Sequence, residues 1–374
     1  MEREKMKILI TGSSGFIAKN LIAELENRGY KELLFCDRTT TREKLESYVE
    51  ECEFIIHLAG VNRPVQEREY YTGNAGFTEE LIKIIEANHK KLPVIYSSTI
   101  LNTPHEHYGK SKREAERLLQ EYGKKTGSPI FIFRLPNVFG KWSRPNYNSF
   151  VATFCYNIAH GLDIKVNDPD AQVTLVYIDD VVNEFISCME EASSKRVEFL
   201  EIPETYETTV GEVAERILDF ERERDSLEIP HIEDTLGKKL YSTYLSYLEP
   251  ENFSYKLRMN QDQRGSFTEF LHLKNLGQIS VNVAKPGIVK GNHWHHTKVE
   301  KFLVVRGTAL IRFRHMVTGK VAEYQVSGEQ LEVVDIPVGY THSIANIGQQ
   351  DLVTIMWANE IFDPKRPDTY YEEV

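Results

Sequence analysis

Hydrophobic residues in the first half of the chain come in short runs that are separated by amphipathic stretches of helical length. The runs are rich in β-branched residues and lie at 7–11, 32–36, 54–58, 93–97 and 130–134. Stretches with apolar residues at helical spacing lie at 21–28, 78–88 and 112–123. Strands that alternate with helices are typical of parallel sheets joined by crossover connections. The pattern therefore predicts an α/β fold with a doubly wound parallel sheet.

The pattern changes in the last third of the chain. From about residue 278, short strands are broken by Gly, Pro and Asn turns, with candidate strands at 279–284, 301–305, 308–314 and 352–358. Such a succession predicts a closed or sandwiched all-β domain. A chain of 374 residues also exceeds what one hydrophobic core usually supports. We place the boundary near 248–253, which gives domains at 1–247 and 253–374.

Composition narrows the class of protein. With 41% hydrophobic and 27% charged residues, the chain is that of an ordinary globular protein, and it has no apolar stretch of about 18 residues to cross a bilayer. A formal charge of −11 argues against nucleic acid as a partner. The charged start lacks the apolar region of a signal peptide, and the four cysteines show no paired spacing. We therefore expect a cytoplasmic protein with reduced thiols.

A glycine-rich segment directly follows the first predicted strand, where it predicts a dinucleotide site. Glycines there permit a tight turn and let backbone N–H groups approach a pyrophosphate at a helix N-terminus. Ala18 stands where a third glycine often occurs. The second strand ends in Asp37, suited to a ribose hydroxyl, and Arg38, suited to the 2′-phosphate of NADP, so the two point to different cofactors. We expect NADPH, with a solvated Arg38 as the alternative. The residues expected to bind the cofactor here are Gly12, Ser14, Gly15, Phe16, Ile17, Asp37 and Arg38.

Tyr108 stands four residues before Lys112 at the start of a predicted helix, so both side chains lie on one face. A nearby ammonium can stabilise the phenolate, which lets a tyrosine act as an acid near neutral pH. Addition of hydride to a ketone needs such a proton donor. The hydroxyl of Thr99, at the end of the preceding strand, is placed to hydrogen-bond the same carbonyl oxygen. This spacing is common by chance, but with the glycine turn it predicts a reductase site.

A second cluster lies in the predicted β-domain. His293 and His295 are two residues apart on an extended strand, so their imidazoles project from one face, while Glu300 and His342 come from neighbouring strands. Three nitrogen ligands and one oxygen ligand suit zinc, nickel, iron or manganese, and we take zinc as the expected metal. The alternative is a set of histidines on a polar surface.

The N-terminal region, over roughly residues 5–245, resembles the extended short-chain dehydrogenase/reductase family, which acts on nucleotide sugars. The matching segments are His57-Leu58-Ala59-Gly60, Asn74, Thr99, Tyr108, Lys112, Arg134 to Gly140 and Tyr177 to Val181. The resemblance implies a Rossmann fold in which Leu58, Ala59 and Gly60 lie along the cofactor. It also implies that Thr99, Tyr108 and Lys112 form the catalytic triad, with Lys112 touching the cofactor. Asn137, Asn146 and Asn148 would then face the sugar nucleotide.

Residues from about 255 to 374 resemble the cupin superfamily of β-barrels. This resemblance is based on His293, His295, Glu300 and His342. The segment Asp262 to Glu269 is similar to one in cupin-type deoxysugar epimerases, which implies that Arg264 meets a sugar diphosphate or an enolate oxygen. The two domains in this order resemble bifunctional enzymes of capsular polysaccharide synthesis. That resemblance implies C3 epimerisation and then NADPH-dependent C4 reduction of a UDP-2-acetamido-2,6-dideoxy-4-keto-hexose, and a homodimer. The implied product is UDP-2-acetamido-2,6-dideoxy-L-talose, a precursor of UDP-N-acetyl-L-fucosamine.

Several alternatives stay open at this level. His295, His296 and Lys301 are candidate bases for the epimerisation, although a metal-bound His295 could not take a proton. The metal either polarises the keto oxygen or only holds the strands together. Three histidines and a glutamate also describe cupin dioxygenases, and a cupin can be a non-catalytic module that binds sugar or forms dimers.

Overall fold

The computed structural model describes residues 3–64, 66–100, 107–191, 197–274 and 276–374. The chain forms two compact units. The first comprises Met1–Leu218 and Ile232–Glu249, and the second comprises Asp219–His231 and Pro250–Val374.

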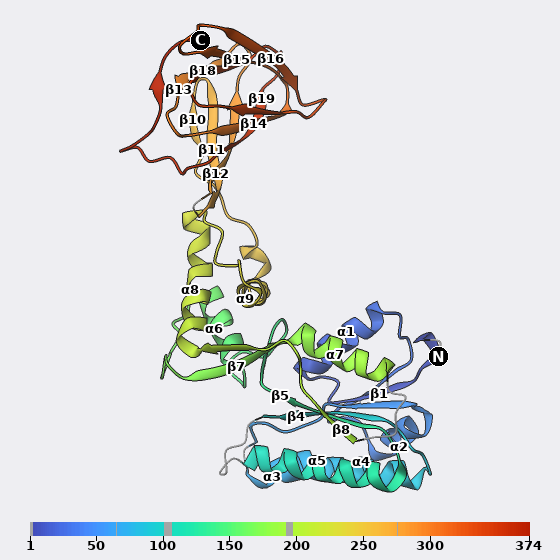
Figure 1. Ribbon diagram of the computed structural model, residues 1–374. Helices are drawn as coiled ribbons and strands as arrows, with labels where there is room; N and C mark the ends of the chain where they lie inside the picture. The colour runs from blue at the N-terminus through green and yellow to red at the C-terminus, as the bar shows by residue number, and fades with distance from the viewer. Residues whose placement is uncertain (1–2, 65, 101–106, 192–196, 275) are drawn as a thin grey trace. The chain divides into compact units, whose positions relative to one another are not determined.

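A parallel sheet forms the centre of the first unit (Figure 1). Its strands lie in the order β2 (Leu33–Cys36), β1 (Ile8–Thr11), β3 (Phe54–His57), β4 (Val94–Thr99), β5 (Ile130–Leu135) and β8 (Val197–Leu200). The chain passes from β1 to β2 on one side and then to β3 on the other, so the loops after β1 and β3 separate at the carboxyl edge. Such a switch point leaves a crevice for a ligand. The predicted doubly wound α/β fold is confirmed.

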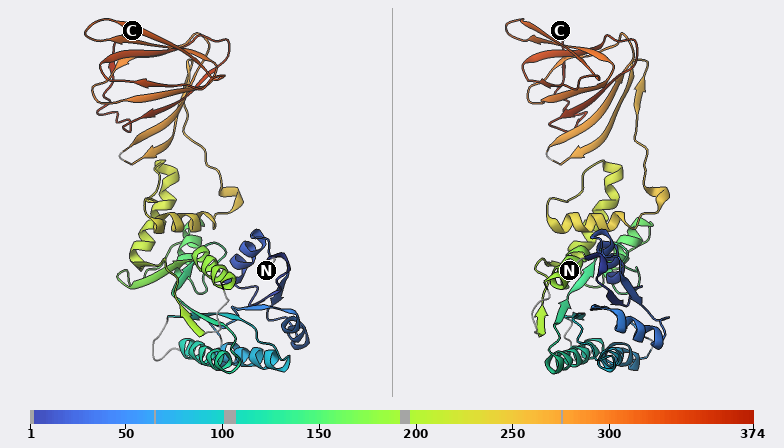
Figure 2. Two further views of the ribbon diagram at one scale, coloured as in Figure 1. Left: turned by 45° about the vertical axis from the view of Figure 1, so that its right-hand side comes forward. Right: turned by 90° about the vertical axis from the view of Figure 1, so that its right-hand side faces the viewer.

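Helices cover both faces of this sheet because alternate strand residues point to opposite sides. Ile8 and Ile10 pack with α1 (Phe16–Asn27) and α7 (Ile178–Glu190). Leu9 packs on the other face with α2 (Arg42–Glu51), α4 (Phe77–Ala87) and α5 (His107–Thr126). Figure 2 shows this layered arrangement of the first unit from two further sides.

The remaining elements of the first unit connect or flank these layers. The short helix α3 (Arg68–Tyr71) runs through the π-helical turn η2 (Thr72–Gly76) into α4. A small sheet contains β6 (Asn137–Phe139), β7 (Gln172–Tyr177) and β9 (Tyr206–Thr209). The other helical segments of the chain are η1 (Arg3–Lys5), α6 (Phe150–Ala159), α8 (Val210–Ser226), α9 (Thr235–Leu245) and η3 (Pro250–Asn252).

The second unit contains two antiparallel sheets that enclose a common interior (Figure 1). One sheet has the order β10 (Asn260–Asp262), β11 (Gly265–Leu273), β12 (Gly277–Ala284), β19 (Leu352–Ala358), β14 (Glu300–Arg306) and β17 (Val333–Ile336). The other has the order β16 (Val321–Ser327), β15 (Thr308–His315), β18 (Tyr340–Asn346), β13 (Val289–Trp294) and β20 (Tyr370–Tyr371). An apolar cluster that includes Phe302, Ile311 and Ile344 packs between them. The predicted all-β cupin barrel is confirmed.

Among the described residues, no helix combines the length and the apolar character needed to cross a bilayer.

Candidate active sites

A cavity of about 950 Å³ opens at the carboxyl edge of the parallel sheet in the first unit. It is lined by most of the residues that the sequence predicts for cofactor and substrate: Gly12, Ser14, Gly15, Phe16, Ile17, Asp37, Arg38, Leu58, Ala59, Gly60, Thr99, Tyr108, Asn137 and Asn148. Lys112 is buried behind this surface, with 3% of its area exposed. Asn146 is not among the lining residues, and its backbone N–H donates to Thr153 Oγ1 at 3.0 Å.

The glycine turn leaves an anion site at the start of α1. Gly12 has φ +69°, and a Cβ at this position would lie 2.7 Å from the backbone nitrogen of Ala59. Gly15 caps the helix without a side-chain hydrogen bond, so the first N–H groups of α1 face the cavity unpaired by a cap. Such a helix N-terminus favours a phosphate group.

Asp37 and Arg38 both line the cavity where β2 ends. Asp37 Oδ1 accepts hydrogen bonds from the backbone N–H and the hydroxyl of Thr39, at 2.9 and 2.7 Å. These bonds lower the pKa of the Asp37 carboxyl. One carboxylate oxygen is therefore engaged within its own turn, whereas the Arg38 side chain is exposed at the cavity.

Tyr108 and Lys112 come from the first turns of α5. Lys112 Nζ donates to the carbonyl oxygen of Ser97 at 2.7 Å and lies 4.5 Å from the centre of the Tyr96 ring. Burial lowers the pKa of Lys112 to about 7, and the charge of Glu116 opposes that effect. Burial also raises the pKa of Tyr108 to about 12, against a hydrogen bond with Asn62. The phenol is therefore protonated near neutral pH, as a proton donor must be.

Asn74 fixes the start of α5 relative to the loop after β3. Its side-chain nitrogen donates to Ser111 Oγ at 2.8 Å and to the carbonyl oxygen of Val61 at 3.1 Å. The hydroxyl of Ser111 in turn donates to the carbonyl oxygen of Tyr108 at 2.8 Å. This buried chain of hydrogen bonds holds the helix that carries the phenol against the cavity wall.

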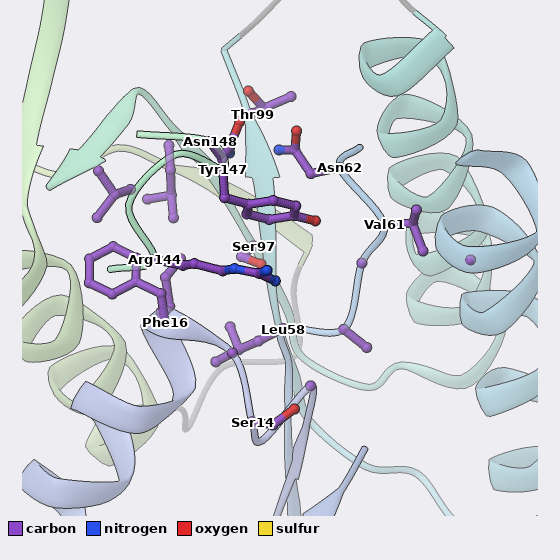
Figure 3. Close-up of a pocket in the computed structure, with 18 of the residues that line it drawn as sticks. Ser14, Phe16, Leu58, Val61, Asn62, Ser97, Thr99, Arg144, Tyr147 and Asn148 are labelled. Carbon is purple, nitrogen blue, oxygen red and sulfur yellow. The ribbon is translucent and has the colours of Figure 1, made fainter. Parts of the chain in front are cut away.

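Among the residues that line the same cavity but were not assigned from the sequence are Asn62, Arg144 and Tyr147. Figure 3 shows Arg144 and Tyr147 projecting into it. The Arg144 guanidinium lies 5.3 Å from the centre of the Tyr147 ring. Both come from the loop before α6, where Trp142 and Asn146 have φ of 69° and 54°. The sequence does show a cation and an aromatic residue, Arg144 and Tyr147, beside Asn146 and Asn148. No spacing rule, however, indicates which side chains of this loop point into the cavity.

The second unit brings His293, His295, Glu300 and His342 together, with one ligand atom of each within 4.8 Å of the others. Glu300 Oε2 lies 3.3 Å from Nε2 of both His295 and His342. A register shift between Gly291 and His293 places His293 opposite His342. One detail differs from the expectation: β13 ends at Trp294, so His295 lies just beyond the strand, in the turn that leads to β14.

The chemistry of this cluster fits a divalent cation. His295 Nδ1 donates to the carbonyl oxygen of Asp368 at 2.6 Å, which directs Nε2 towards the cluster. His342 is buried, and neither of its ring nitrogens has a hydrogen bond of good geometry within the described chain. Burial lowers the pKa of His293 to about 4. Burial would raise the pKa of Glu300, but the His295 and His342 imidazoles hold it well below its ordinary value. Imidazole nitrogens and a carboxylate oxygen that converge on one point are a donor set that suits a divalent metal.

A second cavity, of about 870 Å³, opens beside this cluster. His293, Glu300 and His342 line it together with Arg264, whose guanidinium donates to Asp262 Oδ2 at 2.9 and 2.6 Å. The buried polar side chains of Ser266, Gln278 and Asn282 line the same cavity. A polar interior of this kind suits a hydroxylated ligand.

His295, His296 and Lys301, the candidate bases, are not among the residues that line this cavity. His295 is turned towards Glu300, and His296 is exposed and packs against Trp294 and Tyr370. Lys301 follows Glu300 on β14, so it projects from the opposite face, where its ammonium pairs with Asp335. The residues that do line the cavity and can exchange protons without being metal ligands include Glu269 and Lys290.

A parallel sheet with Tyr108 and Lys112 beside a cavity at its carboxyl edge, together with a barrel that carries a His₃Glu cluster, defines an enzyme of the short-chain dehydrogenase/reductase class with a cupin domain. Residues 8–202 match the model of the NAD dependent epimerase/dehydratase family, to which the chain belongs. Residues 260–370 match the model of the polysaccharide biosynthesis C-terminal domain.

Two relatives match this chain over nearly its full length. The UDP-2-acetamido-2,6-β-L-arabino-hexul-4-ose reductase of Pseudomonas aeruginosa is 45% identical over 365 residues, which cover 98% of each chain. The crystal structure of the capsular polysaccharide assembling protein CapF from Staphylococcus aureus is 47% identical, with a TM-score of 0.90 over 99% of this chain and 100% of that one. A Bordetella bronchiseptica enzyme, WbmF in complex with NADH, is 18% identical with a TM-score of 0.55, over 66% of this chain and 92% of that one. At that identity the likeness is evidence of a common fold alone.

Proposed function

We propose that this enzyme epimerises C3 of a UDP-2-acetamido-2,6-dideoxy-4-keto-hexose in its second unit and reduces C4 with NADPH in its first. The product would be UDP-2-acetamido-2,6-dideoxy-L-talose, for the synthesis of capsular polysaccharide. The observation that carries the proposal is Tyr108 at the wall of the first cavity, one helical turn before the buried Lys112. The Pseudomonas aeruginosa relative, a reductase of a UDP-linked 4-keto sugar, supports the substrate class.

The reductase step assigns one role to each residue of the triad. Bound NADPH would supply the hydride to C4 of the keto-sugar. The phenol of Tyr108 gives its proton to the C4 oxygen as negative charge develops there, and the Lys112 ammonium stabilises the resulting phenolate. The hydroxyl of Thr99 donates a hydrogen bond to the same oxygen. A C4 hydroxyl forms, and Tyr108 regains its proton from solvent.

NADPH is proposed over NADH because Arg38 is exposed at the cavity while Asp37 is partly engaged by Thr39. A guanidinium can pair with a 2′-phosphate through two parallel hydrogen bonds. Arg38→Gln should therefore raise the Kd for NADPH about tenfold or more and leave the Kd for NADH within about twofold. Titration of cofactor fluorescence measures both, and equal effects on the two cofactors would contradict this preference.

The epimerase step depends on the acidity of the C3 hydrogen beside a 4-ketone. A base removes this proton, the electron pair moves into an enolate on the C4 oxygen, and a proton is returned to the other face of C3. Glu269 and Lys290 are the proposed groups for these transfers because they line the cavity beside the cluster. His293, His295, Glu300 and His342 would hold zinc, which would supply either Lewis acidity at the keto oxygen or rigidity.

Joining the two activities has a chemical reason. Epimerisation of C3 is nearly balanced in free energy, so alone it would leave a mixture of isomers. Reduction of C4 removes the carbonyl that makes the C3 hydrogen acidic, and it thereby traps one isomer. We also propose a homodimer, which light scattering of the purified protein would test.

The test is NMR of the UDP-4-keto-sugar in deuterated buffer, with and without NADPH. Tyr108→Phe should abolish NADPH oxidation and leave deuterium entry at C3 intact, because the two steps use different cavities. Loss of both activities in this variant would refute separate sites. Absence of deuterium at C3 with the metal-loaded wild-type protein would favour a non-catalytic cupin, and oxygen consumption with bound iron would favour a dioxygenase.

A further inference from the structure

Glu116 is a buried carboxylate to which the reductase mechanism above gives no role. It lies on α5 one helical turn after Lys112, and only 2% of its area is exposed. Burial of an unpaired carboxylate is strongly unfavourable, so a glutamate is retained at such a position only with partners that hold its charge.

Three hydrogen bonds hold this charge in place. The hydroxyl of Ser98 donates to Glu116 Oε1 at 2.5 Å. Arg134 donates from Nε to Oε1 at 3.1 Å and from a terminal nitrogen to Oε2 at 2.7 Å. The Arg134 side chain is 45% exposed and lies over the Phe199 ring at 4.4 Å. Glu116 therefore joins α5 to β4 and β5, immediately before the strand position of Thr99.

The other ionisable groups around Lys112 are uncharged near neutral pH. Burial lowers the pKa of His57 to about 3, and its ring lies between the hydroxyls of Thr11 and Thr78. Burial raises the pKa of Tyr96 well above its ordinary value and that of Tyr108 to about 12. Among the described groups that face Lys112, Glu116 is thus the anion whose charge acts on the ammonium.

We propose that Glu116 is a positioning residue of the reductase site, whose carboxylate, held by Ser98 and Arg134, keeps Lys112 cationic beside Tyr108. This inference rests on the proposed reduction at Tyr108. Burial has already brought the pKa of Lys112 down to about 7, so near neutral pH a further fall in this pKa would leave the side chain mostly uncharged. Without the opposing anion that pKa falls further, and the charged form is lost at a lower pH.

The measurement is the pH profile of NADPH oxidation, with the holoenzyme and the UDP-4-keto-sugar at saturating concentrations. Glu116→Gln keeps the size of the side chain and removes its charge. The alkaline limb, which reports loss of the Lys112 proton, should move to lower pH by about one unit or more. Glu114→Gln is the matched control, because Glu114 lies exposed on the same helix and pairs with Arg117, and its profile should match the wild type.

Two further variants separate charge from architecture. Arg134→Lys preserves charge but loses the forked hydrogen bonds, so it should lower the thermal midpoint without moving the alkaline limb. If Glu116→Gln fails to fold, the double variant Glu116→Gln/Arg134→Gln removes both charges of the pair, leaves no unpaired arginine and should show the same shift. An unchanged alkaline limb in a folded variant without the Glu116 charge would overturn the inference, as would an equal shift in Arg134→Lys. A wild-type protein that does not oxidise NADPH with this substrate would instead refute the proposed function.

Discussion

Replacing Gly12 by alanine tests whether the tight turn after β1 is what shapes the nucleotide cavity. Gly12 has φ +69°, a conformation that costs a non-glycine residue about 1–2 kcal/mol. Its new Cβ would also lie 2.7 and 2.8 Å from backbone atoms of Ala59, which cannot move as a flexible side chain can. Relief of such overpacking costs about 1–3 kcal/mol, so we expect a total loss of about 2–5 kcal/mol from the first unit.

The assay is urea unfolding followed by a probe in the first unit, with NADPH binding measured by fluorescence. Gly161→Ala is the matched control, because Gly161 has φ +65° and no atom within 4 Å of an added Cβ. The control should carry only the conformational cost, so the difference between the two variants isolates the contact with Ala59. We expect Gly12→Ala to weaken NADPH binding more than tenfold. Equal destabilisation of the two variants, with unchanged NADPH affinity, would refute the role of this turn.

Three further predictions concern other parts of the molecule. His342→Ala should abolish stoichiometric zinc binding, measured by atomic absorption, and should lower the thermal midpoint of the second unit by several degrees. An unchanged metal content would exclude this cluster as the metal site. Arg144→Gln should raise the KM for the sugar nucleotide or the Kd for NADPH by about tenfold, because it removes a cation from the cavity; no change in either would exclude it from binding. His160 donates to Glu249, which raises the histidine's pKa, so this pair stabilises the fold fully below the ordinary histidine pKa of about 6.5 and loses that effect as pH rises through the raised pKa. Accordingly, His160→Gln should lower the thermal midpoint more at pH 5.5 than at pH 8.5, and equal losses at both would contradict the pairing.

Local pattern was sufficient to predict most strands and helices of the first unit, because the spacing of apolar residues within a segment decides its type. The predicted strand at 54–58 is observed as Phe54–His57, and the predicted helix at 112–123 is observed as His107–Thr126. The helix is longer because the segment with Tyr108 already belongs to it. Similarly, the predicted helix at 21–28 begins at Phe16, directly after the capping Gly15.

Contacts between distant residues could not be predicted in this way. The grouping of His293, Glu300 and His342 followed from their spacing, but Asp368 has no local signal. Its carboxylate accepts hydrogen bonds from the backbone N–H groups of the three residues that follow His295, at 2.9–3.0 Å. The hydrogen-bond partners of Glu116 could not be predicted for the same reason, because Ser98 lies on β4 and Arg134 lies on β5.

The hydrogen bonds between Asp368 and residues 295–298 affect the order in which the parts of the protein fold. The segment around it also supplies β20, which pairs with β13, and Tyr370, which stacks on Trp294 at 4.9 Å. Residues 368–371 follow the other described strands of the barrel, so the turn that carries His295 cannot take its final form until that segment has emerged from the ribosome. The nucleotide-binding unit is translated earlier and can fold first. Metal loading would then be among the last events in biogenesis, after the reductase half is already formed.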